Sequence, residues 1–168
     1  LDNLIKKLCP NGVEYVKLWS VTLWDKKFKE TNKKEQSKTI KFKHISANKL
    51  KTMARKEGDV FLLSTGNYSG YTFYDIAKKH INVGEVIAIP TGGRANMKYF
   101  SGKFVDSGNL LAISSDIEKY NLKYIYYYLK SQKDYIERHF RGSGIKHPNM
   151  KNILNLKIPI PHLEVQKE

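Results

Sequence analysis

The sequence predicts an α+β fold, a single domain in which strands and helices share one core. Apolar residues at its start, and again between residues 121 and 140, follow the helical spacing i, i+3, i+4, i+7. Between these two stretches, short apolar runs bounded by glycine are typical of buried strands. The 168 residues are enough for one domain with a proper core.

The first residues predict an amphipathic helix, because four apolar side chains share one face: Leu1, Leu4, Ile5 and Leu8. Pro10 ends this helix, since the residue before a proline avoids helical angles. An amphipathic start of this kind most often docks on the core, and we expect it to do so here. Residues 13–23 then predict an extended segment.

Three segments of different character follow. Residues 25–38 are highly charged and predict a solvated loop. Residues 39–45 alternate apolar and polar side chains, the pattern of a half-buried strand. Residues 48–56 predict a short helix that Gly58 closes.

A weak internal repeat predicts two similar strands. Residues 58–67 and 84–93 each combine a turn glycine, an acidic residue, an apolar strand and a Thr-Gly loop. A third strand, residues 108–114, follows. The loops at Thr65 and Thr91 therefore belong at ends of a sheet, a natural position for a binding surface. The pattern leaves open whether both loops lie at the same end.

Residues 121–140 predict one helix whose apolar face carries six residues: Leu122, Ile125, Tyr126, Leu129, Ile136 and Phe140. Five tyrosines surround it: Tyr120, Tyr124, Tyr127, Tyr128 and Tyr135. Packing at the core and its rim is the favoured interpretation of these tyrosines, and stacking on nucleic-acid bases is the alternative.

The last part of the chain predicts a loop, a helical turn and an extended run. Residues 142–144 read Gly-Ser-Gly, which is open to unusual backbone angles. Residues 148–154 can form one short helical turn with Asn149 as its cap. Residues 156–161 are extended, and two prolines, which lack the amide hydrogen, argue against a central strand.

The charge of the chain points to a polyanionic partner. Lys and Arg number 30 against 16 Asp and Glu, a formal net charge of +14, and the pI is about 9.7. This level is typical of nucleic-acid binding, with a generic basic protein or an acidic membrane surface as alternatives. Four of the basic residues are arginines, so most of the charge suits diffuse attraction to phosphates. A Lys-, Asn-, Ile- and Tyr-rich composition can also reflect an AT-rich genome.

Several chemistries lack their motifs in this sequence. Cys9 is the one cysteine, which excludes an intramolecular disulfide and a cysteine-based zinc cluster and fits the cytoplasm. No apolar run approaches the roughly 20 residues that span a membrane. There is no Asn/Asp-Pro-Pro-aromatic box, phosphate-binding loop or convincing carboxylate cluster. We therefore expect no catalytic residues, no cofactor and no metal.

Three predicted loops carry the residue types that read DNA, where fixed donors and acceptors meet base edges and lysines meet phosphates. Arginine can bind guanine and asparagine can bind adenine with two hydrogen bonds each, and neighbouring glycines allow close backbone approach. For each loop an ordinary solvated turn is the alternative. The candidate DNA-binding residues are Thr65, Asn67 and Tyr68 in the first loop, Thr91, Arg94, Asn96 and Lys98 in the second, and Arg141, Ser143, Lys146 and His147 in the third.

Both ends of the chain resemble a known family. The phrases Gly-Ser-Gly-Ile-Lys-His, Asn-Met-Lys-Asn-Ile and Ile-Pro-Ile-Pro-His-Leu-Glu-Val-Gln-Lys-Glu near the C-terminus are similar to the end of a target recognition domain. That domain belongs to the DNA-specificity (S) subunit of bacterial type I restriction-modification enzymes. Leu-Cys-Pro-Asn-Gly-Val-Glu-Tyr near the N-terminus resembles its beginning. The middle of the chain is only loosely similar.

The resemblance implies a mixed α/β globular domain with a mixed β-sheet and flanking helices. Residues 1–161 would form one target recognition domain, and residues 162–168 the start of a truncated conserved spacer helix. Such a domain recognises one half of a split double-stranded DNA target. A complete S subunit carries two, held apart by helices that bind the methylation (M) subunits, which carry S-adenosylmethionine chemistry, and the restriction (R) subunit joins them.

The leading hypothesis is thus a non-catalytic, sequence-specific DNA-binding module. One rival is a protein-interaction module whose contact surface is residues 1–8 and the tyrosine cluster, the charge being incidental. The other is a fragment of a methyltransferase or nuclease.

Overall fold

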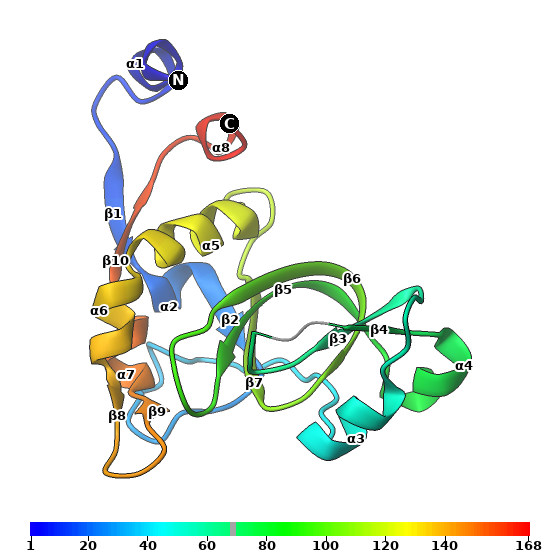
Figure 1. The fold of residues 1–168 in the computed structure, drawn as a ribbon. Helices are drawn as coiled ribbons and strands as arrows, with labels where there is room; N and C mark the ends of the chain where they lie inside the picture. The colour runs from blue at the N-terminus through cyan, green and yellow to red at the C-terminus, as the bar shows by residue number, and fades with distance from the viewer. Residues whose placement is uncertain (68–69) are drawn as a thin grey trace.

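The α+β prediction is confirmed by the computed structural model, which describes residues 1–67 and 70–168 (Figure 1). Its centre is a mixed six-stranded sheet in the order β2-β7-β5-β6-β3-β4. β3 and β6 are parallel, and the other neighbours are antiparallel. The strands are β2 (Thr22–Trp24), β3 (Val60–Leu63), β4 (Gly70–Thr72), β5 (Asn82–Pro90), β6 (Lys98–Asp106) and β7 (Asn109–Ser114).

β5 is buried on both faces of the sheet. Val86 and Ala88 pack in one apolar cluster with Phe104 and Leu111, whereas Ile87 and Ile89 belong to the largest cluster on the other face. Because successive strand residues point to opposite faces, a continuous apolar run is what a strand in this position requires. The strands predicted from the repeat and at residues 108–114 are therefore confirmed as β3, β5 and β7.

The sheet curls strongly between β5 and β7. The start of β5, Asn82, pairs with Phe104 near the end of β6, whereas its last residue, Pro90, pairs with Asn109, the first of β7. Nine strand residues span about 30 Å when straight, but the two residues between β6 and β7 bridge only about 10 Å. β5 and β6 must therefore arc, as Figure 1 shows. Gly102, with φ at +138°, allows a backbone conformation in this arc that other residues avoid.

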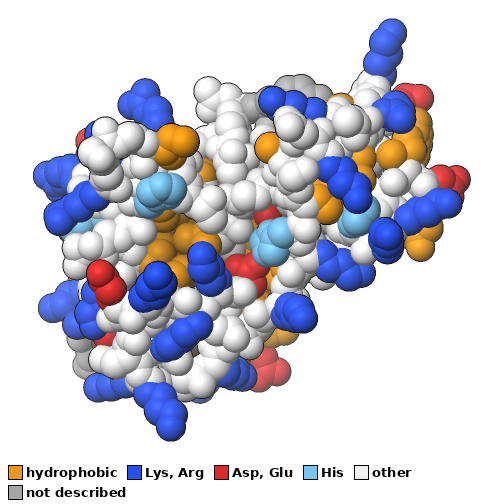
Figure 2. All heavy atoms as spheres, turned by 90° about the horizontal axis from the view of Figure 1, so that it is seen from below, with side chains coloured by type: hydrophobic (Ala, Val, Ile, Leu, Met, Phe, Trp, Pro, Cys, Tyr) orange, Lys and Arg blue, Asp and Glu red, His pale blue; other side chains and the backbone are white. Residues whose placement is uncertain are grey.

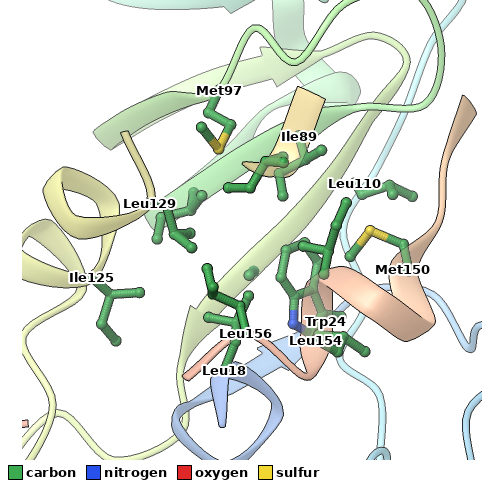
Figure 3. Packing of buried hydrophobic residues seen from close by; sticks show 14 of the residues in the cluster. Leu18, Trp24, Ile89, Met97, Leu110, Ile125, Leu129, Met150, Leu154 and Leu156 are labelled. Atoms are coloured by element: carbon green, nitrogen blue, oxygen red, sulfur yellow. The ribbon is translucent and has the colours of Figure 1, made fainter. Parts of the chain in front are cut away.

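Helices cover the sheet in two groups (Figure 1). The first group packs on the largest apolar cluster and consists of α2 (Leu18–Val21), α5 (Leu122–Ser131), α6 (Lys133–Arg138) and α7 (Met150–Leu154). In Figure 3, labelled side chains from α2, α5 and α7 gather with others from β2, β5 and β7. The second group lies beside β3 and β6 and consists of α3 (Ala47–Met53), α4 (Tyr74–Ala77) and the 3-10 turn η1 (Lys78–His80).

Both ends of the chain meet in a separate ribbon. β1 (Glu14–Lys17) pairs antiparallel with β10 (Lys157–Ile160), a two-stranded sheet that tolerates the prolines as predicted. The ribbon carries α1 (Asp2–Leu8) beside α8 (Leu163–Gln166), away from the large sheet (Figure 1). The helix at residues 2–8 is confirmed, but its docking on the core is wrong, because none of its residues is buried.

Three of the local predictions are wrong because tertiary contacts replaced the local pattern. Residues 13–23 are not continuously extended, since α2 interrupts them and buries Leu18 and Val21 in the largest cluster. Residues 25–38 are not simply solvated, since Phe28, Glu35 and Gln36 are buried. The single helix at 121–140 is two, α5 and α6, which join at Gln132.

Residues 39–45 keep the predicted alternation but not the predicted strand. Ile40 and Phe42 are half-buried between exposed neighbours, yet the segment forms only an isolated bridge from His44 to Asp106. The side chain of Asn82 replaces a strand partner: its Oδ1 accepts from the Lys43 amide at 2.9 Å and its Nδ2 donates to the Lys43 carbonyl at 2.9 Å.

The predicted cap of α7 is confirmed and gives a testable energy. Asn149 Oδ1 accepts from the Asn152 amide at 3.2 Å. Replacing an asparagine cap with alanine costs about 1 kcal/mol, so Asn149→Ala should lower the free energy of unfolding by that amount in urea titrations. The matched change at the exposed Asn48 within α3 should alter it by less than about 0.5 kcal/mol; equal effects from the two would contradict the cap.

Candidate nucleic-acid interface

Two of the predicted loops meet around the turn between β6 and β7. The Ser107 amide donates to the Leu63 carbonyl at 3.1 Å, just before the first loop. The Thr91 amide, in the second loop, donates to the Gly108 carbonyl at 3.0 Å. β3 and β5 run in opposite directions in the sheet, so only its curl brings these loops together. Gly108 is required here, since it has φ at +75° and a Cβ would lie 2.9 Å from Thr65 Cγ2.

Two candidate side chains of the second loop point back into the protein. Asn96 Nδ2 donates to the Thr65 carbonyl at 3.3 Å. Lys98 Nζ donates to the Ser64 carbonyl at 2.8 Å, and burial lowers its pKa. These contacts hold the first and second loops against each other.

The third loop is fastened to the second. Its flanking strands, β8 (Phe140–Arg141) and β9 (His147–Pro148), form a short hairpin. The Gly93 amide donates to the Lys146 carbonyl at 2.7 Å, and His147 Nδ1 lies 2.7 Å from the Thr91 carbonyl. Because a carbonyl only accepts, this contact requires the hydrogen on Nδ1. A hollow of about 420 Å³ lies between the loops and is lined by Thr65, Thr91, Gly92, Gly108, Ile145 and His147, with Ile45, Ser46, Ala47 and Ser107.

Arg94 is the most exposed charged group of the second loop. Its side chain is 90% exposed, and its Nε lies 3.6 Å from Glu137 Oε1. Glu137 Oε2 accepts from the Ala95 amide at 2.9 Å, so α6 supports the backbone beside the arginine. A loosely paired, exposed guanidinium on a supported backbone is able to bind an external acceptor.

Six further candidates are exposed, and one lies outside the described residues. Tyr68 lies outside the residues that the structure describes. Exposed candidates are Asn67, Thr91, Arg141, Ser143, Lys146 and His147. The structure thus brings the three loops together and separates inward-pointing side chains from exposed ones.

An Asp–His–Asp cluster, which the sequence did not reveal, supports the turn from behind. His44 Nδ1 lies 2.6 Å from Asp106 Oδ2, and His44 Nε2 lies 2.6 Å from Asp25 Oδ2. These hydrogen bonds, first that to Asp106 and then that to Asp25, raise the pKa of His44 to about 10. Asp106 also accepts from Asn109 Nδ2 at 2.9 Å, and Asp25 accepts from the Leu111 amide at 2.9 Å. Burial, opposed by the hydrogen bond from His44, raises the pKa of Asp106. The cluster ties residues 25 and 44 to the turn.

Sequence reasoning missed this cluster and the turn. The one available signal was the Asp-Ser-Gly-Asn run at residues 106–109, a turn composition directly after a strand. The distances of 19 and 62 residues that separate His44 from its partners give no local pattern.

The tyrosines pack mostly as predicted. Tyr99, Tyr120, Tyr124, Tyr126, Tyr128 and Tyr135 are partly buried against the largest apolar cluster, whereas Tyr127 is 56% exposed. Tyr124 also donates to the Pro159 carbonyl at 2.7 Å. Packing at the core and its rim is thus confirmed for the partly buried members.

The lower face of the molecule as drawn in Figure 1, which Figure 2 shows directly, is rich in positive charge. Figure 2 shows Lys and Arg side chains distributed over it, with His side chains around an apolar hollow. The molecule is therefore an α+β domain that presents a supported group of polar loops beside basic side chains.

The family follows from comparison with known proteins. A model of the type I restriction modification DNA specificity domain matches residues 10–168, so the chain belongs to that family. It is a DNA specificity domain of the kind found in type I restriction-modification S subunits, which confirms the resemblance at the two ends. A protein-interaction module is not favoured.

Similar proteins carry the same description. The type I restriction enzyme MjaVIII specificity subunit of Methanocaldococcus jannaschii is 29% identical over 98 residues, 57% of this chain and 23% of that protein. The S subunit of a type I system from M. genitalium has a TM-score of 0.63 at 20% identity, covering 92% of this chain and 36% of that one. The HsdS subunit from Thermoanaerobacter tengcongensis has a TM-score of 0.53 at 13% identity, covering 98% and 39%. The chain thus spans about a quarter to two fifths of these relatives.

One further observation concerns membranes. Among the helices of residues 1–67 and 70–168, none combines the length and apolar character of a membrane span.

Proposed function

We propose that this domain reads a few base pairs of double-stranded DNA, one half of a bipartite target, through its three joined loops. The observation that carries the proposal is the hydrogen bonding that fixes the loops to one another while Arg94 stays 90% exposed. Reading a base edge requires hydrogen-bond donors in a fixed position, because a donor on a mobile loop can reorient and so distinguishes less well between base pairs. The charge of +14 supplies attraction to the phosphates.

The loop residues divide into two roles in this proposal. Arg94, Asn67, Ser143 and Lys146 are exposed and face the DNA, with Thr91, Arg141 and His147 at the border of the contact. Asn96 and Lys98, which bond to carbonyls of the first loop, position that loop. Thr65 packs against Gly108 and acts in the same way.

The domain acts as a non-catalytic part of a larger assembly. Within it, the domain directs methylation (M) subunits and, through them, the restriction (R) subunit to the target, in the bacterial cytoplasm. Residues 1–161 are the recognition unit, and residues 162–168, which include α8, begin a spacer helix. The descriptions of the matched relatives, a specificity subunit of a type I restriction enzyme and an S subunit of a type I restriction-modification system, support this division of labour.

Selection from a randomised duplex library tests the proposal. The chain is incubated with the library at low and moderate salt, and the bound DNA is sequenced. We expect a short enriched motif that survives added salt, since base contacts, unlike phosphate contacts, depend on sequence. Binding without a motif would assign the affinity to charge alone, and absence of binding at low salt would overturn the proposal.

Arg94→Ala should relax the enriched motif at one position. An arginine bound to a base contributes about 1–3 kcal/mol of discrimination, so preference there should fall by about fivefold to 150-fold. The loop should keep its shape, because Glu137 still accepts from the Ala95 amide. Arg55→Ala, an exposed arginine after α3, is the matched control and should leave the motif unchanged. An unchanged motif in the Arg94 variant would remove this residue from readout.

A further inference from the structure

The loop of residues 26–30 and the hairpin β8–β9 border a groove of about 420 Å³. Its lining combines basic side chains with an apolar floor. The residues are Lys26, Lys27, Phe28, Lys29 and Glu30 on one side, and Arg141, His147, Pro148, Asn149, Met150 and Lys151 on the other. Phe28 and Met150 are buried, whereas Lys26, Lys29 and Arg141 are exposed.

The walls of this groove are held in place. Gln36, itself buried, accepts from the Phe28 amide at 2.9 Å and donates to the Lys26 carbonyl at 3.0 Å. Lys27 Nζ donates to the Asn32 and Gln36 carbonyls, both at 3.3 Å, so it braces the same loop. The basic side chains of Lys26 and Lys29 therefore project from an ordered backbone.

A half-buried ion pair ties α7, at one side of the groove, to the segment that follows the loop of residues 26–30. Glu35 pairs with Lys151 of α7, and the hydrogen bond from Lys151, opposed by burial, lowers the pKa of Glu35. Glu35 Oε2 also accepts from Asn155 Nδ2 at 3.2 Å. These contacts neutralise Lys151, and Glu30 offsets one more positive charge, so the groove offers a ligand mainly Lys26, Lys29 and Arg141.

The groove continues directly from the loop surface. His147 lines both the groove and the hollow between the three loops, and its ring is fixed by the Thr91 carbonyl. Pro148 and Asn149 lead from the third loop into α7 at the groove floor. A strand whose bases contact the loops would thus have its neighbouring backbone beside the groove.

We propose that this groove binds backbone phosphates of the DNA, next to the base pairs that the loops read, through Lys26, Lys29 and Arg141. The inference rests on the proposed function and extends it to Lys26 and Lys29, which lie outside the three loops. Lysines suit phosphates because a flexible ammonium binds as a point charge, and the apolar floor suits the sugar between two phosphates. Contacts of this kind fix the register of the duplex and carry no sequence information.

The test compares two variants with equal loss of charge. Lys26→Gln with Lys29→Gln removes two charges at the groove, and Lys6→Gln with Lys7→Gln removes two on α1, at the other end of the molecule (Figure 1). Binding of the selected duplex is measured between 0.05 and 0.3 M salt, a range over which the Debye length falls from about 14 Å to about 6 Å. Each lost phosphate contact lowers the slope of log affinity against log salt by about 0.9.

The groove variant should therefore lose about 2 units of slope and between about tenfold and a hundredfold in affinity at 0.1 M salt, with an unchanged motif. Arg141→Gln should add about one further unit. Ethylation of single phosphates next to the motif should weaken DNA binding by the parent chain. The same ethylation should have no effect on DNA binding by the groove variant, which no longer contacts those phosphates. Equal slopes for the two double variants would overturn the groove while leaving base readout intact. A parent chain that binds no duplex would overturn both.

Discussion

Replacing Asp106 with alanine is expected to lower the free energy of unfolding by about 3 kcal/mol or more. The Asp106 side chain is fully buried, and it holds His44 and Asn109 at once. Removing one partner of a buried ion pair leaves the other charge uncompensated, which typically costs about 3–5 kcal/mol. The His44 side chain is 37% exposed and keeps its contact with Asp25, so the lower end of this range applies. Urea unfolding at pH 7 measures the change.

The matched control is Asp75→Ala, an exposed aspartate in the first turn of α4. Its replacement should change the free energy of unfolding by less than about 1 kcal/mol, the size of a helix-dipole contribution. Equal effects at Asp75 and Asp106 would show that the cluster adds no stability of its own. The Asp106 variant should also weaken DNA discrimination, because the turn that joins the first two loops begins at this residue.

The cluster makes stability depend on pH in a defined direction. The pKa of His44 is raised from 6.5 to about 10 in the folded protein, so the folded state binds the proton more tightly than the unfolded chain. The contribution is therefore complete below pH 6.5 and is lost as the pH rises toward 10. Proton NMR of the imidazoles should find His44 still charged at pH 8. Burial, with the nearby Arg141 and Arg138, lowers the pKa of His139, which should be neutral there.

Asp106→Asn removes the negative charge of this side chain and keeps its shape. The amide can donate to a neutral imidazole, whose other nitrogen then donates to Asp25. The pKa of His44 should fall toward its ordinary value in this variant, and the alkaline loss of stability should shrink. A parent protein in which His44 titrates near 6.5 would contradict the charged cluster.

Replacing Gln36 with alanine is expected to cost about 3 kcal/mol and to loosen the loop of residues 26–30. The Phe28 amide and the Lys26 carbonyl would both lose the side chain that bonds them. A buried polar group without a partner costs about 1–3 kcal/mol, and two groups are affected. Gln36→Glu keeps the acceptor for Phe28 but sets a second acceptor against the Lys26 carbonyl in a buried position, so its effect should be no smaller. Urea unfolding gives the energies, and amide hydrogen exchange at Phe28 reports the local loosening.

Gln132→Ala is the matched control, because Gln132 is half-exposed and its side-chain amide makes only a long hydrogen bond, 3.4 Å to Ser131 Oγ. We expect less than about 1 kcal/mol there. If Gln36→Ala left exchange at Phe28 unchanged, the loop would owe its order to other contacts. In that case the groove would not depend on Gln36 for its arrangement.

Much of the fold could be predicted locally. The helix at residues 2–8, the strands at 60–63 and 109–114 and the cap at Asn149 all appear where spacing and residue type indicated. These patterns work because side chains three and four apart share a helix face and alternate residues share a strand face. The charged segment at residues 25–38 escaped such reasoning, because Gln36 and Glu35 are buried by partners distant in the chain or by the loop itself.

The sequence by itself determined the family, the positive charge and the three loops that carry polar residues. Only the tertiary structure decided that the curl of β5 and β6 brings these loops to one turn. It also decided that Arg94 points outward while Asn96 and Lys98 bond to carbonyls about 30 residues away. The physical reason is that the hydrogen-bond partners of a side chain depend on which segments the folded sheet places beside it. The spacing of residues along the sequence does not reveal these partners.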